Sequence, residues 1–203
     1  MSPELAARVA EVARLLRQGG VVAYPTETFY GLGALVTHPE ALRRLAGAKL
    51  RSDGKPLPLI AGDLAQVEGV ASLSAPLARA LAGRFWPGAL TLVLPAAPGL
   101  DPLVRGGDGT VAIRIPGSEV ARALALAAGA PLVSTSANLA GEPPPAAVGE
   151  LSAALRARLD DVLDAGPAPG GVPSTIVAVS GDTVRLLRAG AIPWPQIEAA
   201  TAR

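Results

Sequence analysis

Two groups of polar residues stand immediately after predicted buried strands. Thr26, Glu27 and Thr28 follow the first strand, and a later strand breaks into the second group, Ser134-Thr135-Ser136-Ala137-Asn138. In open α/β sheets, ligands bind at the carboxyl ends of the strands. We therefore expect both groups to face one ligand site.

The chemistry of these groups suits an anion. Hydroxyls, an amide and backbone N–H groups in turns can hold phosphate or carboxylate oxygens, and arginine can supply a planar fork of donors. Arg51, Arg114 and Arg188 each lie at a strand end or in a loop beside these segments. The glycine pairs in residues 31–33 and 106–107 lack the spacing of a dinucleotide fingerprint or a Walker loop. A nucleotide would therefore be bound without either of these phosphate-binding motifs.

The lysines of the chain are unusually placed. The chain has 18 lysines and arginines, and its only lysines, Lys49 and Lys55, stand in one short segment with Arg51. Such a loop can neutralise phosphate charge, or the two lysines can be a chance cluster on a solvated surface. Counts alone leave both interpretations open.

Several kinds of catalysis are disfavoured. The chain has no cysteine, which excludes disulfides, thiolate metal sites and thiol nucleophiles. His38 is the only histidine and stands at a predicted helix start, so a Ser-His-Asp triad is disfavoured. No carboxylate cluster resembles a metal cage, so we expect any ion to be Mg²⁺ that arrives with a nucleotide. For Glu27, a structural capping role and a role in orienting substrate both stay open.

The elements that must position these residues alternate between helix and strand. This alternation predicts an α/β or α+β-like fold, with three layers around a twisted mixed β-sheet flanked by helices. In the strand at 111–115, period-two alternation places Arg114 on the face opposite Ile113. Helices are expected at 3–18, 39–48, from Asp63, from Ser74, at 118–128 and at 148–159. Strands are expected at 21–24, 57–61, 90–95, 111–115, 131–134, 162–164, 174–179 and 184–187.

Size and composition limit the partners. With 203 residues, half of them apolar, the chain can form a single domain over 1–203. A formal net charge of +1 argues against coating nucleic acid by bulk electrostatics. No apolar stretch approaches the length of a membrane span, and the first residues do not resemble a signal peptide. We expect a soluble cytoplasmic protein that does not bind membranes.

An ordered set of motifs resembles one known family. The segments are YPTETFYGLG at 24–33, the basic loop with Pro56-Leu57 after it, RFWPGALTLVLPA at 84–96, TVAIRIP at 110–116, STSAN at 134–138, Ser174-Thr175, and LLRAG at 186–190. Together they are similar to the YrdC-like threonylcarbamoyl-AMP synthases, in the short, single-domain form. The resemblance covers nearly the whole chain and implies the YrdC-like fold, a three-layer twisted mixed sheet with a concave basic face.

The resemblance also implies roles for individual residues. It assigns catalysis to Lys49, Arg51 and Lys55. It assigns threonine binding to Thr28, Arg114, Ser134 and Ser174. It assigns ATP binding to Arg51, Lys55, Thr110, Ser136, Asn138 and Arg188.

The implied reaction joins L-threonine, bicarbonate or CO₂, and ATP into threonylcarbamoyl-AMP and pyrophosphate, with Mg²⁺ on the nucleotide and no organic cofactor. The product would pass to a tRNA threonylcarbamoyl-transferase complex that modifies the adenosine beside the anticodon. Direct binding of tRNA or double-stranded RNA stays open. The alternatives are a non-catalytic RNA-binding or ribosome-maturation paralogue of the same fold, and a carbamoyl-transfer domain of a larger maturation enzyme, which would need flanking domains.

Overall fold

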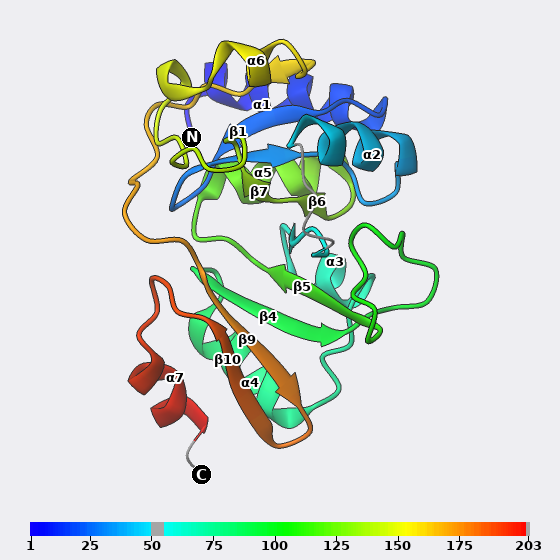
Figure 1. Ribbon diagram of the computed structural model, residues 1–203, viewed down its shortest axis with the longest axis vertical. Coiled ribbons are helices and arrows are strands. Elements are labelled where there is room, and N and C mark those ends of the chain that lie inside the picture. The colour runs from blue at the N-terminus through cyan, green and yellow to red at the C-terminus, as the bar shows by residue number, and fades with distance from the viewer. Residues whose placement is uncertain (50–54, 202–203) are drawn as a thin grey trace.

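The computed structural model describes residues 1–49 and 55–201, and the strands in this part of the chain form two sheets (Figure 1). A four-stranded sheet has the order β7-β2-β1-β8, and a six-stranded sheet has the order β10-β9-β4-β5-β3-β6. Both sheets contain parallel and antiparallel pairs and are flanked by helices. The predicted α/β class is confirmed, with two mixed sheets where the sequence pattern indicated one.

The four-stranded sheet lies in the upper half of Figure 1. Its strands and the elements around it come from two parts of the chain, residues 3–48 and 119–162. They are α1 (Pro3–Arg17), β1 (Val22–Pro25), β2 (Tyr30–Gly33), α2 (Pro39–Ala48), α5 (Glu119–Ala128), β7 (Thr135–Ser136), η1 (Val148–Glu150), α6 (Ala153–Arg156) and β8 (Asp161–Val162).

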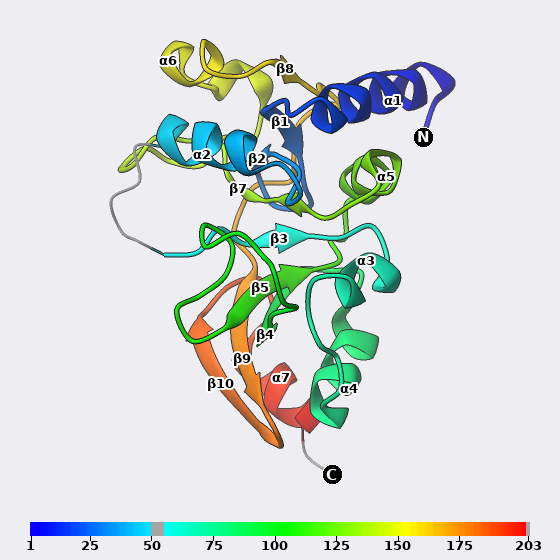
Figure 2. The same cartoon turned by 90° about the vertical axis from the view of Figure 1, so that its right-hand side faces the viewer.

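Most of the six-stranded sheet lies in the lower half of Figure 1, with β6 close to the upper sheet, and Figure 2 shows α4 and α7 on one face of it. Its elements are β3 (Leu59–Ile60), α3 (Leu64–Glu68), α4 (Pro76–Phe85), β4 (Leu90–Pro95), β5 (Thr110–Arg114), β6 (Leu132–Val133), β9 (Thr175–Ser180), β10 (Thr183–Arg188) and α7 (Trp194–Thr201).

Strand β1 is buried on both faces, which explains its continuous apolar sequence. Because side chains alternate along a strand, Val22 and Tyr24 pack with α1 and α5, while Ala23 packs with the α2 side of the sheet. Helix α1 begins where its sequence predicts, since the Ser2 hydroxyl accepts a hydrogen bond from the Leu5 N–H at 3.2 Å. Helix α1 therefore packs on one face of β1.

The chain crosses between the two sheets at Ser134. Strand β6 belongs to the six-stranded sheet and β7 to the four-stranded sheet, and only Ser134 separates them. The Ser134 N–H donates to the Pro58 carbonyl at 2.8 Å, and the Val133 N–H donates to the Ala34 carbonyl at 2.9 Å. Neighbouring residues are therefore tied to opposite sheets, which places Ser134 at the junction.

Strand register brings several distant residues to the same edge of the six-stranded sheet. Strands β4 and β5 are antiparallel, with Leu92 opposite Ile113, so the end of β5 lies beside the start of β4. Strand β9 runs parallel to β4, with Thr91 opposite Ile176. Arg114, Thr91 and Ser174, which precedes β9, therefore share one edge.

Some predicted elements differ from the structure. The helix expected at 148–159 is divided into η1 and α6, because Ser152 caps a new helix by accepting from the Leu155 N–H at 3.4 Å. The helix expected from Ser74 begins at Pro76 instead, since the Ser74 hydroxyl bonds to Ser72 and not to the helix. Strand β2, whose glycines indicated a turn, and helix α7 were not predicted from the sequence.

Strand β2 tolerates its glycines because they let an aromatic ring pack against the backbone. A Cβ added at Gly33 would lie 2.6 Å from Cε1 of Tyr24, whose side chain is fully buried. The Tyr24 hydroxyl donates to the Val133 carbonyl at 3.0 Å, so the ring is held from both ends. Gly33 therefore leaves room on β2 for the Tyr24 ring, and this ring links β1 to Val133 beside the crossing at Ser134.

None of the helices in the described ranges is both long and apolar enough to cross a membrane.

We predict that Gly33→Ala destabilises the protein by about 1–3 kcal/mol, since the buried Tyr24 ring has no space to move. Gly83→Ala is the control, because Gly83 is an exposed residue in α4 with nothing within 4 Å of an added Cβ. The control should be more stable by roughly 0.5–1 kcal/mol, from its helix propensity. Urea denaturation measures both. Equal midpoints for Gly33→Ala and the unchanged protein would contradict the packing described for Tyr24.

Candidate functional site

A cavity of about 250 Å³ lies at the junction of the two sheets. Its walls come from the turn after β1, the end of β5, the β6–β7 crossing, and the segments at β9 and β10. Six predicted site residues from five separate parts of the sequence line this one cavity: Thr28, Arg114, Ser134, Ser136, Ser174 and Arg188.

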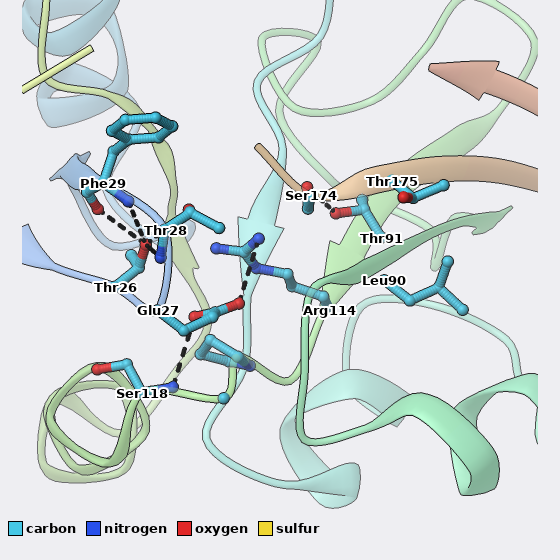
Figure 3. Close-up of polar contacts among 12 residues, drawn as sticks. Thr26, Glu27, Thr28, Phe29, Leu90, Thr91, Arg114, Ser118, Ser174 and Thr175 are labelled. Atoms are coloured by element: carbon cyan, nitrogen blue, oxygen red, sulfur yellow. Dashed lines mark hydrogen bonds and ion pairs between the residues drawn. The ribbon is translucent and has the colours of Figure 1, made fainter. Parts of the chain in front are cut away.

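Arg114 is the most deeply buried charged side chain of the cavity wall, with a relative exposure of 6%. Its Nη1 lies 3.5 Å from Oε1 of Glu27, so the end of β5 is linked by charge to the turn after β1. Figure 3 shows the guanidinium pointing across the cavity toward Thr28, with Glu27 beside it. Burial of a guanidinium is costly unless an anion is near, and Glu27 supplies one. Arg114 therefore has a structural partner and also faces the cavity.

Thr28 is positioned by a tight turn at residues 26–29. The Thr26 hydroxyl donates to the Phe29 carbonyl at 2.8 Å and accepts from the Thr28 N–H at 3.2 Å. The Thr26 and Thr28 hydroxyls are 3.1 Å apart, and the Thr28 carbonyl accepts from the Gly170 N–H at 2.6 Å. Side chain and backbone thus fix the Thr28 hydroxyl at the cavity wall.

Ser174 is held by two neighbours on the opposite wall. Its hydroxyl lies 2.9 Å from the Thr91 hydroxyl, and Arg188 donates to both its carbonyl, at 2.7 Å, and its hydroxyl, at 3.1 Å. Burial, and to a smaller degree the charge of Arg114, lowers the pKa of Arg188 below its ordinary value. Two guanidinium groups thus lie close together with one carboxylate, Glu27, near them. The cavity favours an anionic ligand group.

Lys49, which the sequence suggests as a catalytic residue, is buried against the second polar group. Its ammonium donates to the carbonyls of Ser136, at 2.7 Å, and Asn138, at 2.8 Å. It also lies 3.2 Å from Oδ1 of Asn138. These contacts indicate that Lys49 anchors the 136–138 segment at the edge of the cavity.

Among the described residues, Lys55, Asn138 and Thr110 do not line the cavity. Lys55 is exposed, and Arg51 lies outside the described residues. The Asn138 amide donates to the carbonyls of Leu139 at 3.0 Å and Glu142 at 2.6 Å, which orders the loop beside Ser136. Thr110 stands at the opposite end of β5 from Arg114, about 13 Å away along the strand.

Thr110 has its own local partner. Its hydroxyl donates to Oδ1 of Asp108 at 2.6 Å, and this bond lowers the pKa of the Asp108 carboxyl. The structure therefore separates Thr110 from the cavity that collects the other hydroxyls.

Two residues of the site were not selected from the sequence. Thr91 lines the cavity and stands in a strand that is otherwise apolar, LTLVLP at 90–95. A buried hydroxyl in such a strand was the signal available for it. Glu27 was weighed between a structural role and substrate orientation, and the structure places its carboxylate beside Arg114.

Tyr30 and His38 have structural contacts. Burial raises the pKa of Tyr30 to about 12, and its hydroxyl donates to the Gly166 carbonyl at 2.7 Å. His38 lies outside the cavity, with Nε2 3.1 Å from the Arg17 carbonyl at the end of α1. No group of three or more His, Cys, Asp or Glu side chains that could hold a metal ion occurs among the residues the structure describes.

Comparison with known proteins identifies the family. A family model for Sua5, YciO and YrdC, described as "Telomere recombination", matches residues 14–190. The chain belongs to the Sua5/YciO/YrdC family. The resemblance to this family found in the sequence motifs is thereby confirmed.

Several curated members of the Sua5/YciO/YrdC family are similar over most of the chain. The threonylcarbamoyl-AMP synthase of Bacillus subtilis (strain 168) is 42% identical over 95% of this chain. That of Stenotrophomonas maltophilia (strain K279a) is 44% identical over 84% of this chain and 93% of its own length. The chain spans only 56% of the length of the B. subtilis relative and of a Pyrococcus abyssi relative.

Solved structures of the Sua5/YciO/YrdC family have the same fold. The crystal structure of P. abyssi Sua5 complexed with L-threonine aligns with a TM-score of 0.90 and 35% identity, covering 96% of this chain and 57% of that one. Escherichia coli YciO aligns with a TM-score of 0.80 and 26% identity, covering 91% of this chain and 90% of that one.

The contacts of Lys49 lead to a prediction about stability. Lys49→Met keeps the apolar stem but removes the donor to two buried carbonyls, so it should lower the free energy of unfolding by about 1–3 kcal/mol. Lys55→Met is the matched control, and its effect should stay within about 0.5 kcal/mol because Lys55 is exposed. Urea denaturation compares the two variants. An unchanged unfolding free energy for Lys49→Met would show that Lys49 does not anchor the 136–138 segment.

Proposed function

We propose that this protein is an L-threonylcarbamoyladenylate synthase. The observation that carries the proposal is the cavity that gathers Thr28, Arg114, Ser134 and Ser174 from four parts of the chain. Relatives curated as threonylcarbamoyl-AMP synthases and the L-threonine complex of P. abyssi Sua5 support it. The substrates would be L-threonine, bicarbonate or CO₂, and ATP.

L-threonine would bind in the cavity with its carboxylate toward Arg114. A guanidinium can hold a carboxylate through two parallel hydrogen bonds, which fixes orientation as well as charge. Hydroxyl groups of Thr28, Ser134 and Ser174 would surround the polar atoms of the amino acid. The cavity volume of about 250 Å³ suits a ligand of this size.

ATP would bind at the edge of the cavity that Lys49 stabilises. Ser136 and Arg188 line the cavity with a hydroxyl and a guanidinium, and Asn138 lies beside Ser136 with its amide oxygen 3.2 Å from the Lys49 ammonium. These groups suit phosphate oxygens better than a metal ion, so Mg²⁺ would be held by the phosphates of ATP. No organic cofactor is part of the proposal. Arg51 and Lys55 would add positive charge from the basic loop, and Thr110 stays a less direct candidate because it lies at the far end of β5.

The reaction would have two steps. Threonine loses a proton from its ammonium group, and the amine adds to CO₂ to form a carbamate, with a second proton released to water. A carbamate oxygen then attacks the α-phosphorus of ATP, the bond to the β-phosphate oxygen breaks, and pyrophosphate leaves. Positioning and charge neutralisation supply most of the catalysis in such transfers. This agrees with a cavity rich in hydroxyls and guanidinium groups.

The product would serve tRNA modification beside the anticodon. A threonylcarbamoyl adenylate is an activated acyl group, so a transferase complex must accept it soon after release. We place this exchange in the cytoplasm, where ATP and precursor tRNA occur together. Direct contact of this chain with tRNA is a further part of the proposal.

The activity test is pyrophosphate release from ATP and Mg²⁺ by the purified protein. We predict release only when L-threonine and bicarbonate are both present, because the carbamate must exist before it can attack phosphorus. Mass spectrometry should detect threonylcarbamoyl-AMP in the same mixture. Equal pyrophosphate release with either substrate omitted would rule out this mechanism.

A second test concerns the threonine carboxylate. Arg114→Lys keeps the positive charge but loses the planar fork, so the KM for threonine should rise about 10- to 100-fold, the value of one hydrogen bond to a charged group. The KM for ATP and the melting temperature should change little. Arg156→Lys, on the exposed surface of α6, is the control. Early melting of Arg114→Lys with an unchanged threonine KM would mean that Arg114 is only structural.

A further inference from the structure

The carboxylate of Glu27 is a charged group at the junction that the proposed reaction does not use. Its Oε1 is buried and has no hydrogen-bond partner among the described residues. Oε1 lies 3.5 Å from Nη1 of Arg114, and Oε2 accepts from the Ser118 N–H at 3.4 Å. A buried carboxylate oxygen without a hydrogen bond is costly, so its retention needs a reason.

The far side of Glu27 is held by helix α5. Ser118 is the N-cap of this ten-residue helix, so the carboxylate lies at the positive end of the helix dipole. The stem of Glu27 packs against the backbone of residue 117, where a Cβ added to Gly117 would lie 3.4 Å from Cγ of Glu27. The carboxylate is therefore fixed with respect to α5 and has little freedom to follow Arg114.

On the side of Glu27 that faces Arg114, the two groups attract each other without a close hydrogen bond. Charge-assisted hydrogen bonds between a guanidinium and a carboxylate are usually about 2.7–2.9 Å long. The separation of 3.5 Å is longer, and no hydrogen bond of the Arg114 guanidinium occurs within the described residues. A purely structural pair would use two close hydrogen bonds. Here the donors of Arg114 stay available to a ligand in the cavity.

The second guanidinium makes the Glu27 charge necessary. Arg188 lines the same cavity, and the charge of Arg114 helps to lower its pKa, so the two cations are close enough to repel. Without a carboxylate behind it, Arg114 would gain by turning away from Arg188. Glu27 attracts the guanidinium toward the junction and opposes that movement.

We propose that Glu27 is a positioning residue, which holds the Arg114 guanidinium in the orientation that receives the threonine carboxylate. The inference rests on the proposed function and extends it. Helix α5 holds Glu27, Glu27 orients Arg114, and Arg114 receives the substrate. Glu27 contributes through its charge at a fixed place, because its reach is limited by the contacts with Ser118 and residue 117.

The experiment measures L-threonine binding to the full chain by isothermal titration calorimetry, so it does not depend on turnover. Glu27→Gln keeps the size and the acceptor for Ser118 but removes the charge. Its dissociation constant for threonine should rise about tenfold, within the range for coupled neighbours, and Glu119→Gln should stay within about twofold. Glu119 is the matched control, because it is an exposed carboxylate in the first turn of the same helix. In an Arg114→Lys background, Glu27→Gln should add no further loss.

The outcomes separate the inference from the proposed function. If the unchanged protein binds no threonine, the proposed function fails, and the inference fails with it. If it binds threonine but Glu27→Gln binds equally well, only the inference is overturned. A tenfold loss that persists in the Arg114→Lys background would mean that Glu27 does not act through Arg114. Should Glu27→Gln not fold, Glu27→Asp keeps the charge one methylene further from Arg114, and threonine binding of native strength by that variant would overturn the inference.

Discussion

The charge contact between Glu27 and Arg114 joins the two halves of this protein at the place where the ligand site lies. Glu27 follows β1 of the four-stranded sheet, and Arg114 ends β5 of the six-stranded sheet. The guanidinium is nearly inaccessible to water, so removing either partner would leave a buried charge without compensation. The same contact links one sheet to the other and keeps a cation in the cavity wall. The site therefore depends on a charge contact between the two sheets.

In the cavity walls, some side chains hold the hydroxyl groups that face the cavity. Ser174 is held by Thr91 and Arg188, and Thr28 by the turn around Thr26. These two hydroxyls thus have fixed positions before a ligand enters. Fixed donors and acceptors need little reorganisation when charge develops at a reacting centre, and this favours a reaction that proceeds by orientation and charge neutralisation. The arrangement agrees with a site that has arginine and hydroxyl groups but places its one histidine elsewhere.

Lys49 illustrates how a functional interpretation and a structural one can apply to the same residue. The resemblance suggested catalysis, whereas the structure shows its ammonium between the carbonyls of Ser136 and Asn138. An ammonium donates three hydrogen bonds, so it can hold a loop through its carbonyls while its positive charge still acts on a ligand nearby. The loop that carries Ser136 gains its shape from this contact. Lys55, six residues later, is exposed, so the two lysines that stand together in the sequence have different surroundings.

The sequence by itself determined the α/β class, most helix starts and strands, and the polar groups of the site, because capping residues, apolar periodicity and hydroxyls after strands are local signals. It also placed Arg114 on the face of its strand opposite Ile113. Only the tertiary structure decided that the strands form two sheets, that Glu27 pairs with Arg114, and that Thr91 supports Ser174. It likewise separated Thr110 from the cavity, since both ends of one strand look alike in a motif but lie about 13 Å apart. Contacts between residues distant in the chain depend on strand order and register, and local sequence does not specify these.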